Sequence, residues 1–416
     1  MSLSRQLFAV ATVGTTAFAI SAADWTRFRG PNGTGVVEGT VPTSFDMAKD
    51  VAWKAKLPGV GHGSPIVIGD KVILPTSSKD GNERSLLCLS AKTGETVWAY
   101  TVEGKTGKTH KKNNLASGTP CTDGERVYAA FWDGDGVTVR AVSLDGKELW
   151  KESLGSFKSQ HGVGHTPIVV SGLVILNFDQ DGAAELVAFD VKSGERKWSQ
   201  KRPPYRACYS TPFLNEPTGK PAELIVATTT SIDSYDPKTG NANWSHAVAW
   251  ANPAKKLRSI GQPIVAGGKV VMSTGDGDGS RYMLAVDPRG GKPSRSWELK
   301  KNVPYVPGLL THKDHLYWIG DDGWARCVDA KSGQEKWNEQ VLFSSAVSSS
   351  PILVGDTVLA ISEDGNAVAF TASPDGPGDV KKSDVGEPVF ASPAAANGKL
   401  YVRGGDHLFC IQKKGS

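Results

Sequence analysis

DAKSGQEKW (residues 329–337) is the stretch that decides the fold, because close variants of it recur along the chain. The variants are SAKTGETVW (90–98), DVKSGERKW (190–198) and DPKTGNANW (236–244). Each variant follows a short apolar run and ends in Trp. Self-similarity with a period of roughly 40 to 50 residues is typical of propellers and solenoids. The sequence therefore predicts a repeat architecture.

A second signal marks where each repeat begins. Ser-Pro or Thr-Pro followed by apolar residues occurs at 64–69, 119–124, 166–172, 211–216, 350–355 and 392–398, with a variant at 262–268 and a degenerate copy at 306–314. The prolines of these eight starts are 42 to 55 residues apart. Within each repeat, short apolar runs alternate with turns rich in Gly and Asp, which is typical of antiparallel strands and not of helices.

Four strands in each of eight repeats predict an all-β fold, an eight-bladed β-propeller of four-stranded antiparallel blades with almost no helix. A flat sheet would leave exposed edges in every repeat, whereas a ring packs the blades face to face. The last repeat ends after its third strand, and VAWKAKL (51–57) resembles the fourth strand of the other repeats. We therefore expect residues 51–57 to close the ring as the outer strand of the last blade.

The recurring stretch itself has a structural interpretation. Its Gly suits a tight turn that needs positive φ, and the Asp before it can accept backbone N–H bonds across that turn. The Trp offers a large flat ring to the neighbouring blade. The equivalent residues are Trp53, Trp98, Trp150, Trp198, Trp244, Trp297 and Trp337. We expect the stretch to build blades and not to bind a ligand.

The N-terminus resembles a secretory signal peptide, with Arg5, an apolar stretch at 7–20 and small residues at 21–23. We predict a signal peptide at 1–23, cleaved after Ala22 or Ala23, an N-terminal extension at 24–50 and a single propeller at 51–416. An uncleaved anchor is the alternative, although the apolar stretch is short for a membrane span. The mature chain is then expected to be a soluble monomer in the periplasm or outside the cell, without an integral membrane span.

Charge and cysteine content exclude several classes of function. The 47 basic and 43 acidic residues are well mixed, with a net charge of +4, which argues against a nucleic-acid partner. The cysteines are Cys88, Cys121, Cys208, Cys327 and Cys410. Their odd number and isolation argue against a disulfide framework and against structural zinc, and favour buried apolar positions. The sequence also has no HExxH or phosphate-loop motif.

The repeat, written A/S/D-x-K-T/S-G-x-x-x-W, resembles the PQQ-like propeller repeat over the chain from residue 24 to the C-terminus. That family includes quinoprotein dehydrogenases, which hold pyrroloquinoline quinone (PQQ) and calcium on the propeller axis. It also includes non-enzymatic propellers such as BamB of the outer-membrane protein assembly machinery. The stretches at 28–35 and 110–131 further resemble exported propellers of planctomycete-type bacteria.

Departures from both branches shape the functional hypotheses. The dehydrogenases share two adjacent cysteines and inserted funnel segments, whereas no cysteine here neighbours another. BamB is lipid-anchored through a Cys after its signal peptide, and no Cys stands at that point here. The leading hypothesis is an exported non-catalytic propeller that binds a protein, peptide or saccharide, with no cofactor; PQQ with calcium lacks support. The alternative is a PQQ-dependent alcohol or sugar dehydrogenase of reduced size, and a hydrolase or lyase at the axial mouth is a third.

Any ligand site is expected on the loops that precede the repeat prolines, which share one face with the turns between second and third strands. The candidate ligand-binding residues are His110, Asn113, Asn114, His161, His165, Arg206, Tyr209 and Arg258. They suit an anionic or polar ligand such as a carboxylate or a sugar. The alternative is that they only satisfy backbone groups of crowded loops. No catalytic residue or metal ligand is predicted, although Asp-rich turns at 133–136, 179–182 and 276–279 leave calcium as an alternative.

Overall fold

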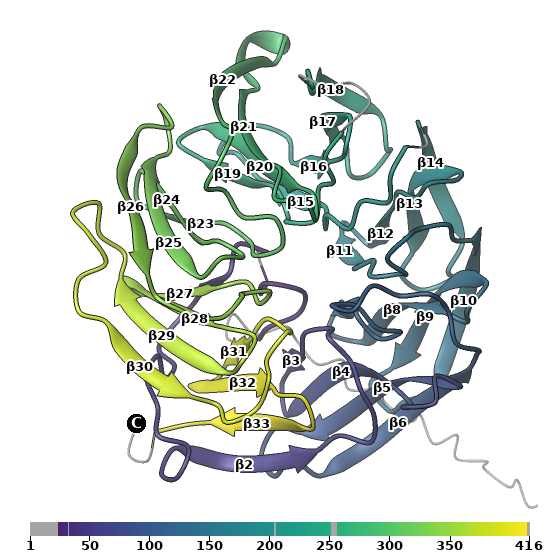
Figure 1. Cartoon of the computed structure of the whole chain (residues 1–416). Helices are drawn as coiled ribbons and strands as arrows, with labels where there is room; N and C mark the ends of the chain where they lie inside the picture. Colours follow the sequence, from purple (N-terminus) through teal and green to yellow (C-terminus); the bar gives the residue numbers. More distant parts are fainter. Residues whose placement is uncertain (1–23, 32, 204, 251–255, 414–416) are drawn as a thin grey trace, which may run out of the picture.

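The computed structural model describes residues 24–413 apart from 32, 204 and 251–255, so the predicted signal peptide at 1–23 lies outside the described residues. The described chain forms eight sheets arranged as blades around a central axis (Figure 1). This confirms the predicted all-β, eight-bladed propeller. Within the described ranges, helical structure is limited to one 3-10 turn, η1 (Arg289–Gly291). None of the described residues belongs to a helix with the length and hydropathy needed to cross a membrane.

The blades follow one another along the chain, each starting with its inner strand. Blades 1 to 4 contain β3 (Ile66–Ile68), β4 (Lys71–Ser77), β5 (Glu83–Ser90) and β6 (Thr96–Glu103); β7 (Cys121–Thr122), β8 (Arg126–Trp132), β9 (Gly136–Ser143) and β10 (Glu148–Ser156); β11 (Ile168–Val170), β12 (Leu173–Phe178), β13 (Ala184–Asp190) and β14 (Arg196–Arg202); and β15 (Phe213–Asn215), β16 (Glu223–Ala227), β17 (Ser231–Tyr235) and β18 (Ala242–Ala247).

Blades 5 to 8 complete the ring. They contain β19 (Ile264–Ala266), β20 (Lys269–Gly275), β21 (Arg281–Asp287) and β22 (Ser294–Leu299); β23 (Leu310–His312), β24 (His315–Ile319), β25 (Trp324–Asp329) and β26 (Glu335–Val341); β27 (Ile352–Val354), β28 (Thr357–Ile361), β29 (Asn366–Thr371) and β30 (Lys381–Asp384); and β31 (Ala394–Ala396), β32 (Lys399–Arg403), β33 (His407–Ile411) and β2 (Val51–Lys56). Strand β2 pairs antiparallel with β33, with Trp53 opposite Cys410. The predicted closure by residues 51–57 is therefore confirmed.

The apolar core is divided among the junctions between neighbouring blades. Strand β12 is buried at every residue, because blades cover both of its faces. The outer strand β6 instead alternates between exposed and half-buried residues. At the junction of blades 2 and 3, for example, Tyr128 packs in one cluster with Val174 and Phe189. This arrangement explains why inner strands read as continuous apolar runs in the sequence.

The recurring stretch builds these junctions as expected. Gly240 has φ of +73°, and a Cβ placed on it would lie 2.6 Å from the ring of Trp198 in the preceding blade. A Cβ on Gly194 would meet the ring of Trp150 at 2.7 Å. In the same turn as Gly240, Asp236 accepts the backbone N–H of Lys238 at 2.7 Å. Gly is therefore required twice in this turn, by its φ and by the indole that lies against it.

In five of the repeats, the Ser or Thr before the repeat Pro forms a second set of junctions, which the sequence did not reveal. Backbone N–H groups donate to side-chain hydroxyls of the next blade in the order Gly308 to Ser350 (3.0 Å), Ser350 to Ser392 (2.8 Å), Ser392 to Ser64 (3.0 Å), Ser64 to Thr119 (3.0 Å) and Thr119 to Thr166 (3.1 Å). We call this series the hydroxyl belt. It links blades 6, 7, 8, 1, 2 and 3 around the axis.

Residues 24–31 and 33–37 run inside the ring, and we call them the N-terminal plug (Figure 1). Trp25 exchanges backbone hydrogen bonds of 2.9 and 2.8 Å with Val67 of blade 1. The Gly33 carbonyl accepts from Gln262 of blade 5 at 2.9 Å, and Arg29 donates to the Leu309 carbonyl beside blade 6. Strand β1 (Val36–Val37) then pairs in parallel with β27 and adds a fifth strand to blade 7. The extension therefore crosses the axis and joins blades on opposite sides of the ring.

Candidate functional site: the axial funnel

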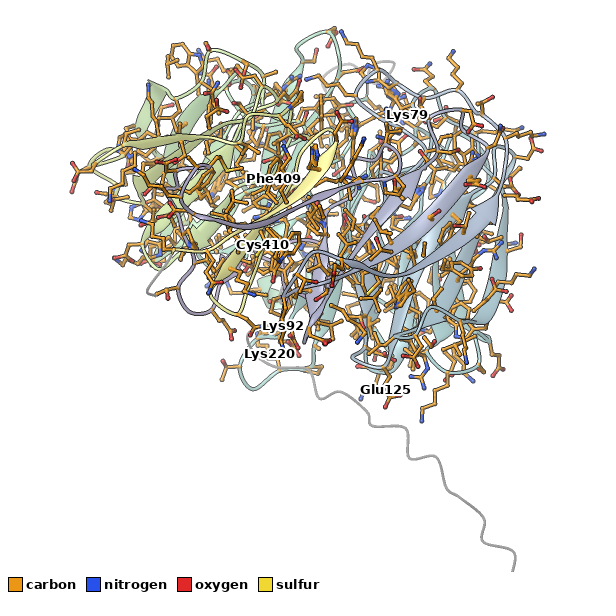
Figure 2. The ribbon with its side chains drawn as sticks, turned by 90° about the horizontal axis from the view of Figure 1, so that it is seen from below. Lys79, Lys92, Glu125, Lys220, Phe409 and Cys410 are labelled. Carbon is orange, nitrogen blue, oxygen red and sulfur yellow. The ribbon has the colours of Figure 1, made fainter. Side chains whose placement is uncertain are left out.

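The two faces of the propeller differ in which connections they carry. Figure 2 shows Lys79, in the β4–β5 turn, on one face and Lys92 and Glu125, in the β5–β6 and β7–β8 turns, toward the other. A cavity of about 470 Å³ is lined by inter-blade loops, including His62, and by second-to-third-strand turns, including Asp276. These two kinds of connection therefore share one face, as expected. We call the cavity the axial funnel.

The inner part of the axial funnel belongs to residues already described. Phe28 of the N-terminal plug contributes to its lining. So do the hydroxyl-belt residues Ser64, Thr119, Thr166, Ser350 and Ser392. The plug and the belt thus set the depth and the polarity of the cavity.

Four of the eight candidate residues, His110, Asn113, His161 and Tyr209, line the axial funnel together. The rings of His110 and His161 stack with centroids 4.9 Å apart. The Asn113 side-chain amide donates to the His161 carbonyl at 2.7 Å, and the Tyr209 hydroxyl donates to the Gly162 carbonyl at 2.8 Å. Three consecutive inter-blade loops are therefore tied to one another on this side of the funnel.

The other four candidates lie behind or beside the lining. Asn114 accepts the Ala116 N–H at 2.9 Å within its own loop. His165 is buried, with its ring centroid 5.0 Å from that of Phe157. Arg206 donates to Asp276 at 2.8 Å, and Arg258, which is 1% exposed, has its Nη1 2.7 Å from Nδ1 of His161. In the structure their contacts hold the loops in place.

The imidazoles of this region are neutral at neutral pH. Burial, with a smaller contribution from the positive charge of Arg403, lowers the pKa of His62 to about 4. Burial and the adjacent Arg258 likewise lower the pKa of His161 to about 4. The pKa of His110 is lowered by burial and by its cationic neighbours. A neutral imidazole offers one donor and one acceptor, so these rings can direct hydrogen bonds without carrying charge.

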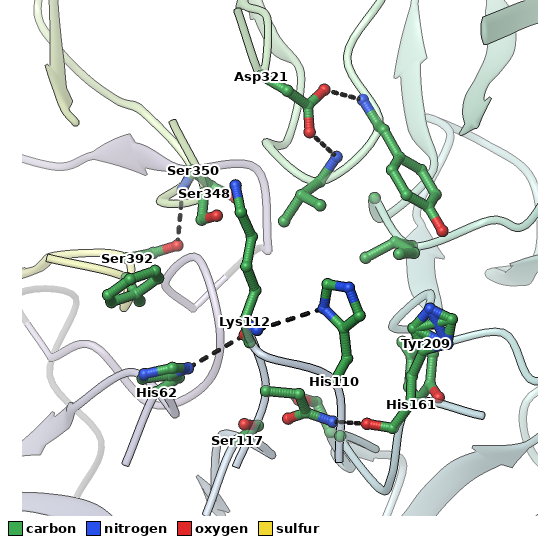
Figure 3. Close-up of a pocket in the computed structure, with 18 of the residues that line it drawn as sticks. His62, His110, Lys112, Ser117, His161, Tyr209, Asp321, Ser348, Ser350 and Ser392 are labelled. Carbon is green, nitrogen blue, oxygen red and sulfur yellow. Dashed lines mark hydrogen bonds between the residues drawn. The ribbon is translucent and has the colours of Figure 1, made fainter. Parts of the chain in front are cut away.

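Several lining residues were missed among the sequence candidates. His62 stacks on Phe390 with centroids 4.4 Å apart, and Asp321 and Lys112 also face the cavity (Figure 3). Tyr305 contributes to the lining as well. A positional rule would have found two of them, His62 and Phe390, because the residue three positions before the repeat Pro lines the funnel in seven of the eight repeats. These residues are His62, Ser117, Gly164, Tyr209, Ile260, Ser348 and Phe390. The candidate set followed residue type instead of position.

Charged side chains of the axial funnel are already engaged within the protein. Lys112 extends across the funnel toward Ser348 (Figure 3), and its Nζ lies 2.5 Å from the Glu363 carboxylate. The Ser348 hydroxyl donates to the same oxygen at 2.5 Å. Asp321 accepts the backbone N–H of Tyr305 at 2.7 Å, and burial raises its pKa. The funnel is therefore polar but internally compensated at several points.

The residues present do not fit the PQQ and calcium pair of the dehydrogenase branch. Calcium takes six to eight oxygen ligands. In the Asp-rich turns, however, Asp276 is bound by Arg206 and Asp179 by Arg202, each at 2.8 Å or less. Across the described ranges, no three His, Cys, Asp or Glu side chains are grouped to hold a metal. All five cysteines are free and buried, so none presents a sulfur surface over the funnel.

The fold defines a PQQ-like β-propeller, with a polar funnel on its axis. The family model described as "Outer membrane protein assembly factor BamB" matches residues 37–207 and 138–302, more than half of the chain. The protein therefore belongs to this family. BamB of Burkholderia pseudomallei (strain K96243), named "Outer membrane protein assembly factor BamB", is 26% identical over 373 residues, which cover 86% of this chain and 87% of the relative.

Solved structures agree on the architecture. BamB from Moraxella catarrhalis has a TM-score of 0.60 at 15% identity, covering 88% of this chain and 98% of that one. Quinohemoprotein alcohol dehydrogenase from Comamonas testosteroni has a TM-score of 0.65 at 14% identity, covering 96% and 82%. At such identities both structures show the fold alone. The expected planctomycete-type origin has no support from these relatives.

Proposed function

We propose that this protein is an exported, non-catalytic scaffold that takes part in outer membrane protein assembly and binds a protein at its funnel face. The observation that carries the proposal is the match to a named assembly factor over 86% of this chain and 87% of the relative. The alignment covers nearly the whole length of both proteins, so the proposal rests on the entire propeller and not on a fragment.

The geometry of the axial funnel supports a binding role. Its lining combines aromatic surfaces, such as the stacked His62 and Phe390, with hydrogen-bonding groups fixed by neighbouring loops. Pockets of a few hundred Å³ with a small number of placed polar groups are typical of ligand sites. A peptide segment of a protein partner fits this chemistry, and a saccharide is the alternative ligand.

Export is part of the same proposal. The N-terminal plug begins at Asp24, whose carboxylate accepts the Gly69 N–H at 2.9 Å, and Trp25 follows with two backbone bonds. Cleavage after Ala22 or Ala23, with an extension at 24–50 and the propeller at 51–416, would leave these contacts intact. Edman sequencing of the protein from the periplasmic fraction should therefore start at Ala23 or Asp24. A start at Met1 would contradict export by a cleaved signal peptide.

The assembly function can be tested in the organism that produces the protein. Deleting its gene should lower the amount of folded outer membrane proteins, measured by their heat-dependent migration on gels, and the intact gene should restore it. Unchanged levels in the deletion strain would overturn the proposed function. In parallel, titrating the purified protein with PQQ and calcium should give no bound-quinone absorbance and no dye reduction with alcohols or sugars.

A further inference from the structure

We propose that the axial funnel binds a carboxylate group of an extended peptide, with Lys112 as the cation that receives it. This inference rests on the proposed function, because the peptide would belong to the protein partner. It goes further by naming the chemical group that is recognised and the residues that recognise it.

Buried positive charge behind the funnel wall is the first observation. Arg258 and Arg403 are 1% and 2% exposed. Arg403 donates to the carbonyls of Gly63 and Pro75, at 3.0 and 2.6 Å, and Arg258 faces the neutral His161. Within the described part of the chain, neither guanidinium is within 4.0 Å of a carboxylate. Lys111 and Lys112 add two further cations to the lining. A buried charge without a counter-ion favours an anion nearby.

The protein's own carboxylate shows how such an anion would be held. Lys112 belongs to the loop between blades 1 and 2, yet it reaches Glu363 of blade 7, 251 residues away in the sequence. The Lys112 ammonium and the Ser348 hydroxyl converge on one oxygen of Glu363, each at 2.5 Å. The Glu363 carboxylate therefore occupies the position at Lys112 that the carboxylate of a ligand would take. A ligand carboxylate would compete with it for Lys112.

A neutral donor points into the same space. The Lys112 backbone N–H donates to Nδ1 of His110 at 3.2 Å. The proton of a neutral imidazole must then be on Nε2, on the far side of the ring. Figure 3 shows the His110 ring projecting beside the Lys112 side chain. A carboxylate bound to Lys112 would thus find an imidazole N–H donor without meeting a second fixed charge.

The size and the surfaces of the cavity indicate a peptide. About 470 Å³ is far more than a lone carboxylate needs, and the aromatic rings of Phe390, Tyr209 and Tyr305 line the remainder. Aromatic faces bind apolar side chains, whereas the ordered hydroxyls and amides bind backbone groups. The carboxylate can come from a C-terminus or from an Asp or Glu side chain, and the two sources can be distinguished experimentally.

Binding of matched peptides to the full-length mature protein tests the inference. Isothermal titration calorimetry would compare N-acetyl-Gly-Tyr-Leu with a free C-terminus, its C-terminal amide, and the amide of N-acetyl-Glu-Tyr-Leu. The free acid should bind at least tenfold more tightly than its amide, and the affinity should fall with salt. Tight binding of the Glu peptide amide would assign the site to acidic side chains. N-acetylglycine should bind weakly, because it leaves the aromatic surfaces unused.

Two variants should change the affinity in opposite directions. Lys112→Ala should reduce the difference between acid and amide to less than twofold. Glu363→Gln should instead strengthen binding of the acid about three- to tenfold, because Lys112 loses its internal partner. Lys92→Ala, on the opposite face, is the matched control and should change nothing (Figure 2). A purely structural role of the Lys112–Glu363 pair would weaken binding in both variants, so the opposite signs separate the two explanations.

Equal affinity for acid and amide, or no saturation by any peptide at millimolar concentration, would overturn the inference. Binding of glucuronate in place of the peptides would overturn the peptide assignment in favour of an acidic saccharide. The two proposals fail separately. Unchanged levels of folded outer membrane proteins in the deletion strain would overturn the assembly function. If the deletion lowers these levels but a Lys112→Ala gene restores them fully, the assembly function stands and the carboxylate site does not.

Discussion

The junctions that flank blade 4 are built differently from the other junctions of the ring. Elsewhere the repeat Trp donates its indole N–H to a carbonyl of the next blade, as Trp98 does to Leu144 at 2.9 Å and Trp337 to Ser373 at 2.8 Å. At the blade 4 junctions, the indole nitrogens of Trp198 and Trp244 are buried without a partner among the described residues. Among the described residues, none continues the hydroxyl belt from Thr166 to blade 4.

Specific side-chain chemistry replaces the regular bonds there. Arg202 of blade 3 forms an ion pair of 2.7 Å with Asp179 and lies 3.7 Å from Asp233 of blade 4. After blade 4 the repeat stretch also changes to DPRGGKPSRSW (287–297), and a Cβ placed on Gly290 or Gly291 would meet nothing within 4 Å, so no Trp ring lies against this turn. The comparison teaches that regular repeats close the ring through backbone carbonyls and hydroxyls. Next to blade 4, the buried ion pair with Asp179 holds Arg202 within blade 3, where Arg202 faces Asp233 of blade 4. The loops of this sector supply Tyr209 to the funnel lining and Arg258 behind it.

The largest effect is expected from breaking that ion pair. Asp179→Ala leaves Arg202 buried with only the more distant Asp233, and removing one partner of a buried pair costs about 3–5 kcal/mol. In the parent protein burial lowers the pKa of Arg202, but Asp179 outweighs it and raises that pKa. An arginine guanidinium stays protonated in proteins, so the variant retains a buried charge without its close partner. Urea unfolding measures the loss. The surface pair of Arg196 and Glu185 in the same blade is the control, and Glu185→Ala should cost about 1 kcal/mol or less. Equal losses would show that burial adds nothing to the contribution of the Arg202–Asp179 pair.

Acid should destabilise the same region through His165, which packs near Tyr209 and Phe178. Burial lowers the pKa of His165 to about 4, below its ordinary value of 6.5. Between these two values the unfolded chain binds a proton that the folded chain does not, so stability is lost as the pH falls from about 6.5 to 4. A depression of this size corresponds to about 3 kcal/mol. The unfolding midpoint of His165→Phe, measured across this range, should fall less steeply than that of the parent protein.

Groups facing His165 set the control for this measurement. Its Nε2 lies 3.4 Å from the Asp179 carbonyl, and the Asp179 carboxylate is its nearby charge. His62 and His161 also have a pKa near 4 and keep part of the pH dependence in the variant. An unchanged slope in His165→Phe would show that His165 titrates normally in the folded protein.

Most of the fold could be predicted from the sequence because its signals are local. The first strand begins directly after the repeat Pro, at Ile66 after Pro65 and at Cys121 after Pro120. The turn of Asp236 and Gly240 and the closure by β2 follow from the same repeat. In contrast, the N-terminal plug has no repeat and makes contacts such as Gly33 with Gln262, 229 residues apart, so no local pattern announces it.

The candidate site was predictable in part for the same reason. The loops were correctly expected on one face, and four of the eight candidate residues line the funnel. Which side chains meet depends on the ring geometry, as with Arg258 and His161, 97 residues apart, and Lys112 and Glu363, 251 apart. Residue type alone favoured Arg258 and His165, whereas burial places both behind the surface.

A smaller loss of stability is expected when a hydroxyl of the belt is removed, and a still smaller loss when the hydroxyl before the Pro of blade 4, where the belt is interrupted, is removed. The Thr119 hydroxyl accepts the Ser64 N–H at 3.0 Å, and Thr119→Val leaves that buried N–H without an acceptor while keeping the shape of the side chain. An unsatisfied buried donor costs about 1–3 kcal/mol. Thr211 occupies the same position before the Pro of blade 4, outside the belt, so Thr211→Val should cost less than half as much. Similar urea midpoints for the two variants would mean that the belt adds nothing to closure.

The finest distinction concerns the indole N–H itself. Trp150 and Trp198 are 8% and 9% exposed, and each lies against the turn Gly of the next blade, so their packing is closely matched. Only Trp150 donates from its indole to a carbonyl of the next blade, that of Val191 at 3.0 Å. Replacing either Trp by Phe removes similar apolar area, and Trp150→Phe should therefore be about 1 kcal/mol more destabilising in urea unfolding. A larger loss for Trp198→Phe would show that ring packing, and not the bond to the carbonyl, distinguishes the regular junctions from those of blade 4.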